Sequence, residues 1–477
     1  MKGKFYITTS IDYVNASPHL GHALEKVQAD AIARYQRLLD KEVYFLTGTD
    51  EHGIKIVRSA QSANKDVKSF IDENSAKVVE LIKKLNISNN DFIRTSDKNR
   101  HWPGAQLIWK KFVEAGDIYK GKYSGYYCVG CETYVKESDL INGKCPYHYT
   151  EPEKIEEENY FFKLSRYADE IKKRIESGEL KILPESRKNE ILATIREGIE
   201  DISFSRPAEK LAGWGVPVPD DDSQLMYVWC DALANYISAL GYGSDNEENF
   251  KKFWPADLHI IGKDILRFHA FIWPAMLLSA KLPLPKTIFV HGFIISDGKR
   301  MSKTLGNVID PFDLIERYGA DAARYYLLRE ITPFEDGDIT EEKFKETYNA
   351  NLANGLGNLT ARIMKMSEQY LENKELRIMK YELPEDYKKF MNSFELSKAM
   401  DLIWQKISEM DLYIQKTQPF KLIKEDEEKA KKILRELVSG LWDIALMLKP
   451  FLPQTSEKII AAIQSNKMPE SLFPRIN

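Results

Sequence analysis

Two histidines, His19 and His22, flank Gly21 at the point where a predicted strand gives way to a predicted helix. The apolar, β-branched run that starts at Lys4 predicts a buried strand, and the periodicity of residues 23–39 predicts a helix. A helix N-terminus presents backbone N–H groups and a positive dipole end, and imidazole adds further donors. Gly21 lets a flat ring approach the backbone. This junction is therefore a candidate phosphate site, although a surface turn explains the four residues equally well.

A carboxylate, Asp50, follows the second predicted strand, Glu42 to Thr49. A strand, a helix and a strand in succession predict a right-handed βαβ unit and a parallel sheet. In such sheets ligands bind at the carboxyl ends of the strands. Asp50 is a candidate ligand-binding group, and a helix N-cap is the alternative.

Four possible metal ligands form two knuckles, Cys-x-x-Cys and Cys-x-x-His, separated by thirteen residues. This spacing is typical of a tetrahedral zinc site, and four protein ligands leave no open position for catalysis. We therefore expect one structural Zn²⁺ per chain, with reduced cysteines in a metal-free fold as the alternative. Asn142-Gly143, between the knuckles, predicts a small hairpin. The ligands are Cys128, Cys131, Cys145 and His148.

A basic loop follows Thr287 to Phe293, which we predict to be the last strand of the chain. Lys299, Arg300 and Lys303 place three cations within five residues of a Gly- and Ser-containing segment. Such a loop can close on a polyphosphate, although most basic loops are only solvated surface.

The elements that position these groups alternate between strand and helix in two blocks. The second block has a strand that turns into a helix over 224–236, a strand over 257–262 and a helix over 263–280. The predicted fold class is α/β: a split, doubly wound, Rossmann-like parallel sheet with a zinc-knuckle insertion between its halves. We expect an α-helical bundle after it, because apolar residues recur at helical spacing from about Tyr348 onward.

Two features of the bundle are candidates for binding. Asn358 and Arg362 are four residues apart and share a helix face, where a solvated edge is the default explanation. Pro419 ends a helix and leaves Phe420 where it can be exposed. The predicted divisions of the chain are 1–115 and 224–298 for the halves of the sheet domain, 116–223 for the insertion, 299–347 for the basic loop and its surroundings, and 348–477 for the bundle.

Length and composition exclude several classes of protein. A chain of 477 residues is too long for one core. Its net charge of −4 confines any nucleic-acid contact to local patches. No apolar run reaches the roughly 18 residues of a membrane span, and the start of the chain lacks a secretory signal. We expect a cytoplasmic protein that does not bind membranes.

Together these motifs resemble the class I aminoacyl-tRNA synthetases, and within that class the methionyl-tRNA synthetases. Residues 18–22 (PHLGH) are similar to the first class signature, HIGH, and residues 300–304 (RMSKT) to the second, KMSKS. Residues 49–53 (TDEHG), 227–229 (YVW), 262–265 (GKDI) and 473–476 (FPRI) extend the resemblance over essentially the whole chain.

The resemblance implies activation of L-methionine by ATP with Mg²⁺, followed by transfer to elongator and initiator tRNA(Met). It implies a catalytic set of His19, His22, Arg300 and Lys303. The implied methionine site comprises Ile11, Tyr13, Asp50, Trp229, Ala232, Tyr236, Ile265 and His269, with Asp50 on the substrate ammonium. The implied ATP site comprises His19, Gly21, His22, Glu25, Gly262, Asp264 and Lys303, and the implied anticodon contacts are Asn358, Arg362, Pro419 and Phe420.

Three residues depart from the family pattern. Arg300 replaces the first lysine of the second signature, Thr304 its last serine, and Phe420 a tryptophan. The chain also lacks the carboxyl-terminal tRNA-binding and dimerising module of some relatives, which favours a monomer. The alternatives are another class I synthetase, a non-catalytic tRNA-binding homologue, or a small-molecule adenylyltransferase on the same sheet.

Overall fold

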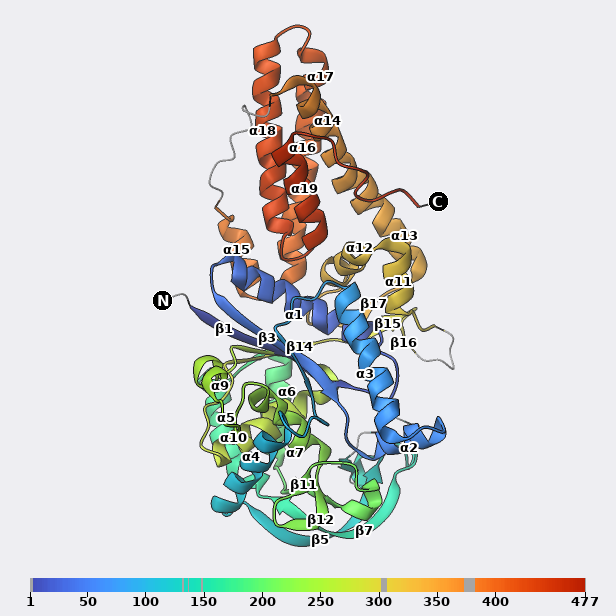
Figure 1. Cartoon of the computed structure of the whole chain (residues 1–477), viewed down its shortest axis with the longest axis vertical. Helices are drawn as coiled ribbons and strands as arrows, with labels where there is room; N and C mark the ends of the chain where they lie inside the picture. The colour runs from blue at the N-terminus through green and yellow to red at the C-terminus, as the bar shows by residue number, and fades with distance from the viewer. Residues whose placement is uncertain are drawn as a thin grey trace. The chain divides into compact units, whose positions relative to one another are not determined.

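The computed structural model describes residues 3–130, 133–135, 137–146, 149–301, 307–372 and 382–476. The chain divides into two compact units, each of which draws on several stretches of sequence (Figure 1). Unit 1 contains Met1–Pro18, Lys41–Glu80 and Asn89–His291, and unit 2 contains His19–Asp40, Leu81–Ser88 and Gly292–Asn477.

Unit 1 is built on a parallel sheet with seven strands among the described residues. Its central strand, β1 (Lys4–Thr9), pairs with β3 (Glu42–Asp50) on one side and β13 (Leu258–Gly262) on the other. The chain therefore reverses its direction of winding at β1, which confirms the doubly wound sheet. The remaining strands are β2 (Asp12–Tyr13) and β4 (Asp91–Arg94) beside β3, and β14 (Thr287–His291) and β8 (Lys181–Leu183) beyond β13.

Short strands account for most of the differences from the predicted elements. β4 and β8 are four and three residues long, too short to produce a clear alternation of polar and apolar residues. Thr287 to Phe293 is not the last strand, as predicted, because β15 (Ile294–Ser296), β16 (Lys299–Arg300) and β17 (Gly337–Asp338) form a small sheet in unit 2. β14 ends at His291, and the next residue, Gly292, has no room for a side chain: a Cβ would lie 2.1 Å from the Glu335 carbonyl oxygen.

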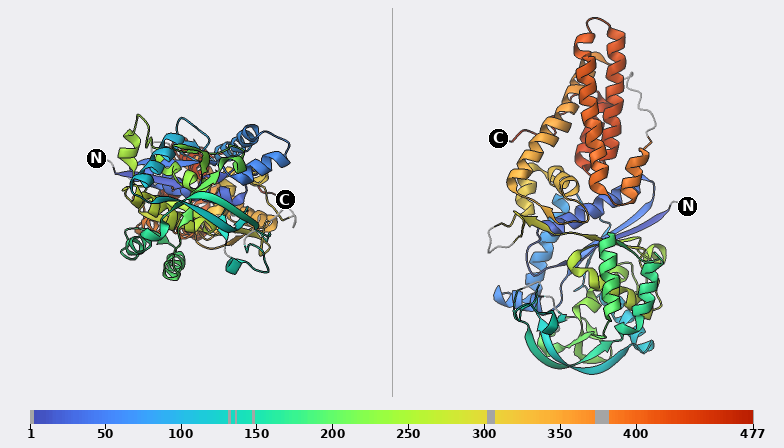
Figure 2. Two further views of the ribbon diagram at one scale, coloured as in Figure 1. Left: turned by 90° about the horizontal axis from the view of Figure 1, so that it is seen from below. Right: turned by 180° about the vertical axis from the view of Figure 1, so that it is seen from behind.

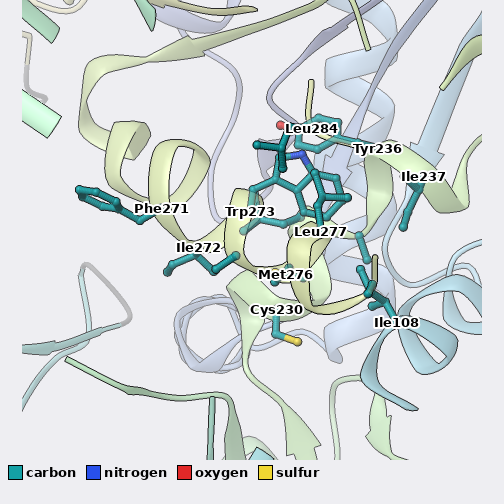
Figure 3. Close-up of a cluster of buried hydrophobic side chains, with 14 of the residues drawn as sticks. Ile108, Cys230, Tyr236, Ile237, Phe271, Ile272, Trp273, Met276, Leu277 and Leu284 are labelled. Atoms are coloured by element: carbon teal, nitrogen blue, oxygen red, sulfur yellow. The ribbon is translucent and has the colours of Figure 1, made fainter. Parts of the chain in front are cut away.

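Helices bury the sheet of unit 1. Figure 3 shows part of this core, where Trp273 and Leu277 of α10 (Trp273–Ser279) lie near Tyr236. Met276 and Ile108 of α4 (Trp102–Glu114) belong to the same buried cluster. Tyr236 is 1% exposed, and its carbonyl oxygen accepts a hydrogen bond of 2.7 Å from the Tyr6 hydroxyl of β1. Tyr236, which the family resemblance places in the methionine site, is therefore part of the buried core of unit 1.

An antiparallel sheet carries the first knuckle cysteine (Figure 1). β5 (Ile118–Cys128) pairs with β7 (Glu153–Phe162), and β6 (Thr133–Val135) and β9 (Ile202–Ser203) flank them. The predicted hairpin at Asn142-Gly143 is confirmed: both residues have positive φ, and the backbones of Ile141 and Lys144 pair across the turn.

Unit 2 ends in the predicted helical bundle (Figure 2). Its long helices are α14 (Asn358–Tyr370), α16 (Leu396–Thr417), α18 (Glu427–Leu448) and α19 (Pro453–Ser465). They bury the apolar stripes seen in the sequence, including Ile363, Ile407 and Leu441. In the part of the chain that the structure describes, no helix is long and apolar enough to cross a membrane.

Candidate active site

His269 lies in a chain of hydrogen bonds inside unit 1. Its Nδ1–H donates to the Ile265 carbonyl oxygen at 3.0 Å, and its Nε2 accepts from the Tyr236 hydroxyl at 2.7 Å. Burial lowers the pKa of the imidazole to about 4, so the ring is neutral at physiological pH. Both side chains are 1% exposed. This arrangement presents a fixed, uncharged ring rather than an acid or a base.

An aromatic stack borders this chain of hydrogen bonds. The rings of Trp229 and Phe268 lie parallel with centroids 3.8 Å apart, and Trp229 meets His269 edge-on at 6.3 Å. Aromatic faces of this kind suit a polarizable thioether. Phe268 was missed from the sequence, although its place next to His269 was a usable signal.

Irregular helix turns place these side chains. The predicted helix over 263–280 is present but irregular: a 3₁₀ turn at Lys263–Ile265 and a π-helical turn at Phe268–Ile272 precede α10. Such π turns occur frequently at functional sites because they shift the direction of side chains.

Asp50 is the last residue of β3 and is 6% exposed. It does not cap the following helix, because the N-cap of α2 (Ile54–Ser62) is Gly53, with φ of 104°. Oδ1 of Asp50 accepts two long hydrogen bonds, of 3.4 Å from the backbone N–H of His52 and 3.5 Å from the Thr95 hydroxyl. The capping alternative is therefore wrong, and the carboxylate lies at the carboxyl end of its strand.

The other residues of the predicted methionine site also belong to unit 1. Ile11, Tyr13, Trp229 and Ile265 are partly buried and pack against the core, whereas Ala232 on α7 (Val228–Leu233) is 3% exposed. Ile11 follows β1, and Ile265 follows β13. These strands are neighbours at the reversal of strand order, which is where ligands bind in doubly wound sheets.

Gly262 and Asp264 lie at the same edge of the sheet. Gly262 ends β13, and a Cβ there would lie 2.7 Å from Oδ1 of Asp264. Any side chain at position 262 would therefore displace the exposed Asp264 carboxylate.

The two signature histidines begin α1 (Leu20–Leu38) in unit 2 and cap it mutually. Nδ1 of His22 accepts from the His19 backbone N–H, and Nδ1 of His19 accepts from the Gly21 N–H, each at 3.1 Å. The two rings stack with centroids 3.8 Å apart. A neutral imidazole that accepts at Nδ1 carries its hydrogen on Nε2, so both Nε2 atoms are donors. Glu25, one turn further on, is 4% exposed.

Several predicted site residues are only partly described. Arg300 pairs through its backbone with Ile295 in the small sheet of unit 2, and Lys303 lies outside the described residues. Cys128 and Cys145 are each 1% exposed, and Cys131 and His148 lie outside the described residues. In the described ranges no three His, Cys, Asp or Glu side chains group as metal ligands.

The predicted anticodon residues lie in the helical bundle. Asn358 is exposed at the start of α14, and Arg362 forms an ion pair with Asp411 of α16. Pro419 begins α17 (Pro419–Leu422), where Phe420 is 44% exposed. A large aromatic ring open to solvent in this way is suited to stacking.

Comparison with known proteins gives consistent results over the whole chain. The family "tRNA synthetases class I (M)" matches residues 5–154 and 137–364, and "Anticodon binding domain of methionyl tRNA ligase" matches 364–473. A methionine–tRNA ligase of Clostridium acetobutylicum is 45% identical over 96% of this chain and 73% of its own length. One of Brucella melitensis is 42% identical over 96% of this chain and 91% of its own length. A structure of Mycobacterium tuberculosis methionyl-tRNA synthetase with methionyl-adenylate superposes with a TM-score of 0.90 at 36% identity, covering 100% of this chain and 99% of that one.

The doubly wound sheet and the helical bundle define the fold of a class I aminoacyl-tRNA synthetase. Within that class, the chain belongs to the methionyl-tRNA synthetase family.

Proposed function

We propose that this chain joins L-methionine to ATP, forming methionyl-adenylate and pyrophosphate, and then transfers the methionyl group to the 3′ end of tRNA(Met). Its membership of the methionyl-tRNA synthetase family supports this reaction. The structural observation that best supports this reaction is the neutral His269, which is hydrogen-bonded to Tyr236 and to the Ile265 carbonyl beside an aromatic stack.

The proposed methionine site has one charged end and one apolar end. Asp50 binds the ammonium group, and Trp229, Ala232, Tyr236, Ile265 and His269, with Ile11 and Tyr13, enclose the thioether. A charged His269 would be costly beside an apolar side chain, and its lowered pKa avoids that cost. The depressed pKa and the stacked rings both support this assignment.

The proposed ATP site relies on positioned charge rather than acid–base chemistry. Attack of the methionine carboxylate on the α-phosphorus brings two anions together and releases pyrophosphate. His19 and His22 donate to the phosphates through Nε2 at the N-terminus of α1, and Arg300 and Lys303 supply cations. Gly21, Glu25, Gly262 and Asp264 accommodate the adenosine. Mg²⁺ bound with ATP would neutralise the phosphate charge further.

The zinc site stays a proposal, with Cys128, Cys131, Cys145 and His148 as ligands. The two described cysteines are almost fully buried, which suits thiolate ligands of a closed structural site. Zinc there would fold the knuckles and take no part in the reaction. Elemental analysis should find one zinc per chain in the purified protein, and Cys128→Ser should lower that content. A Cys128→Ser protein with unchanged zinc would contradict the ligand set.

We propose that each predicted segment of the chain has its own role in the reaction. Residues 1–115 and 224–298 would activate methionine, 116–223 would carry the zinc, 299–347 would close on the phosphates and 348–477 would read the anticodon with Asn358, Arg362 and Phe420. We expect a cytoplasmic monomer that charges both elongator and initiator tRNA(Met).

The reaction is tested by methionine-dependent ATP–pyrophosphate exchange and by charging of tRNA(Met). Loss of one good electrostatic contact to a developing charge costs about 10²–10³ in rate. Lys303→Ala should therefore lose at least about 100-fold in exchange. An exchange rate unchanged by Lys303→Ala would remove the basic loop from the proposed site.

A further inference from the structure

The carboxylate of Asp231 is buried between two imidazoles in unit 1. Its Oδ2 accepts from Nδ1 of His52 and its Oδ1 from Nε2 of His101, each at 2.6 Å. The three side chains are 1%, 3% and 0% exposed, respectively. Neither histidine is among the residues assigned to substrate or metal.

The hydrogen bonds of this cluster are complementary. Nδ1 of His101 lies 2.8 Å from the Ser238 hydroxyl, so a neutral His101 can accept there while it donates to Asp231. Burial alone would raise the pKa of the Asp231 carboxyl, but its electrostatic interactions and hydrogen bonds with the rings of His52 and His101 lower it to about 2. A buried carboxylate is costly unless it is hydrogen-bonded, so each ring is held firmly.

The cluster joins three segments that are distant in the sequence. His52 lies two residues after Asp50, Asp231 lies between Trp229 and Ala232 on α7, and His101 immediately precedes α4. Neither His52 nor Asp231 can shift without moving a neighbour that we assign to the methionine site.

The surroundings of His52 leave it little freedom. Its ring packs against Trp102 and Trp214, with centroids 6.3 and 5.8 Å away. The neighbouring Glu51 is fully buried: its carboxylate accepts from Arg94 Nε, and its carbonyl oxygen accepts from Trp214 Nε1, both at 2.7 Å. The end of β3 is thus fixed on both sides, whereas the two hydrogen bonds described above for Asp50 itself are long.

We propose that His52, Asp231 and His101 are positioning residues that fix the ammonium end of the methionine site relative to its thioether end. This inference rests on the proposed function. In this proposal the cluster does not contact the substrate. It fixes the distance between Asp50 on β3 and the α7 residues Trp229 and Ala232. Loosening it should weaken methionine binding selectively, because ATP has other contacts.

The direct test is Asp231→Asn, assayed by ATP–pyrophosphate exchange. An amide cannot accept a hydrogen bond from both imidazoles in their present tautomers, so one contact is lost. We expect the KM for methionine to rise at least about tenfold while the KM for ATP stays within twofold, since misplacement of a positioning group weakens a site sharply.

Asp117→Asn is the matched control. Asp117 is another fully buried carboxylate of unit 1, and it accepts from Ser279 Oγ at 2.7 Å and Arg166 Nη1 at 2.6 Å. Its loss should lower the melting temperature and leave the methionine KM unchanged. A methionine KM that rises equally in both variants, or in neither, would overturn the positioning role.

His101 provides a second pair of variants in case Asp231→Asn does not fold. His101→Ala should raise the methionine KM, and His101→Gln, whose amide N–H can donate to Asp231, should restore it to within about threefold. Failure of glutamine to rescue would count against the proposal. If the unmodified protein shows no methionine-dependent exchange, the proposed function fails instead, and the two failures are distinguishable.

Discussion

At the scale of single residues, the site depends on the ionisation states that burial imposes. His269 is neutral because its ring is enclosed, and its two nitrogens are committed to the Ile265 carbonyl and the Tyr236 hydroxyl. Asp231 remains ionised because two imidazoles face it. Unit 1 thus buries an uncharged ring and a paired anion, and neither needs to exchange protons in the proposed reaction.

The lowered pKa of His269 predicts a pH dependence of stability. The unfolded chain binds a proton at this position below about pH 6.5, whereas the folded protein binds it only below about 4. The neutral His269 therefore contributes fully to the free energy of unfolding above about pH 6.5, and this contribution decreases as the pH falls from about 6.5 to about 4. At pH 5.5 the loss should be about 1.4 kcal/mol relative to pH 7.5. Urea unfolding of wild type and His269→Gln at both pH values measures it. An equal loss in the two proteins would contradict a depressed pKa.

At the scale of elements, α1 shows how a helix start becomes a phosphate site. The mutual cap of His19 and His22 satisfies backbone N–H groups within the first turn and leaves the ring hydrogen of each neutral imidazole on Nε2. Gly21 makes this possible, because a Cβ there would lie 2.9 Å from Cε1 of His19.

Gly21→Ala should therefore separate activity from stability. Alanine favours a helix over glycine by about 1 kcal/mol, so folding should not suffer. The His19 ring must rotate away, and we expect ATP–pyrophosphate exchange to fall at least about tenfold. Gly355→Ala is the control, because the nearest described atom to its Cβ is a carbonyl oxygen at 3.5 Å. Comparable exchange rates in the two variants would contradict the role of His19.

The exposed Phe420 gives a second prediction at this scale. Stacking of a base on an aromatic side chain contributes about 1–3 kcal/mol. Phe420→Ala should lower kcat/KM for tRNA(Met) charging by about 5- to 150-fold and leave exchange unchanged. Met468→Ala removes a similarly exposed apolar side chain, 47% exposed, as a control. Normal charging by Phe420→Ala would remove this residue from the anticodon site.

At the scale of the whole molecule, unit 2 contains both the signature helix α1 and the helical bundle. Arg324, fully buried, joins them: it pairs with Asp30 of α1 at 2.7 Å and donates to the carbonyl oxygens of Pro450 and Phe451, between α18 and α19. The helix that carries His19 and His22 is thus packed with the domain proposed to read the anticodon.

Arg324→Met should be strongly destabilising. Removing one partner of a buried ion pair typically costs about 3–5 kcal/mol, because the remaining charge stays buried. Arg317→Met, which breaks an exposed ion pair with Glu341, should change the free energy of unfolding far less. Denaturant unfolding of the two variants compares them directly. If Arg324→Met and Arg317→Met unfolded with similar free energies, the buried ion pair of Arg324 would not be important for stability.

Features that depend on neighbouring residues could be predicted from the sequence. Contacts between residues that are far apart in the sequence could not. The strand ending at Asp50, the Asn142-Gly143 hairpin and the apolar stripes of the bundle all produce local patterns, and the structure contains them. His52 and His101 lie 179 and 130 residues from Asp231, so no spacing indicates their contact. The helix over 263–280 was predicted, but its π-helical turn was not, because such turns keep the composition of an ordinary helix.

The central claim is that this chain selects and activates methionine. ATP–pyrophosphate exchange measured separately with each of the twenty amino acids tests it most directly. We predict exchange that is strongest with methionine and at least about 100-fold weaker with leucine and cysteine, in keeping with a site built around a thioether and an ammonium group. Exchange that is fastest with any other amino acid, or that is absent with all of them, would contradict the account.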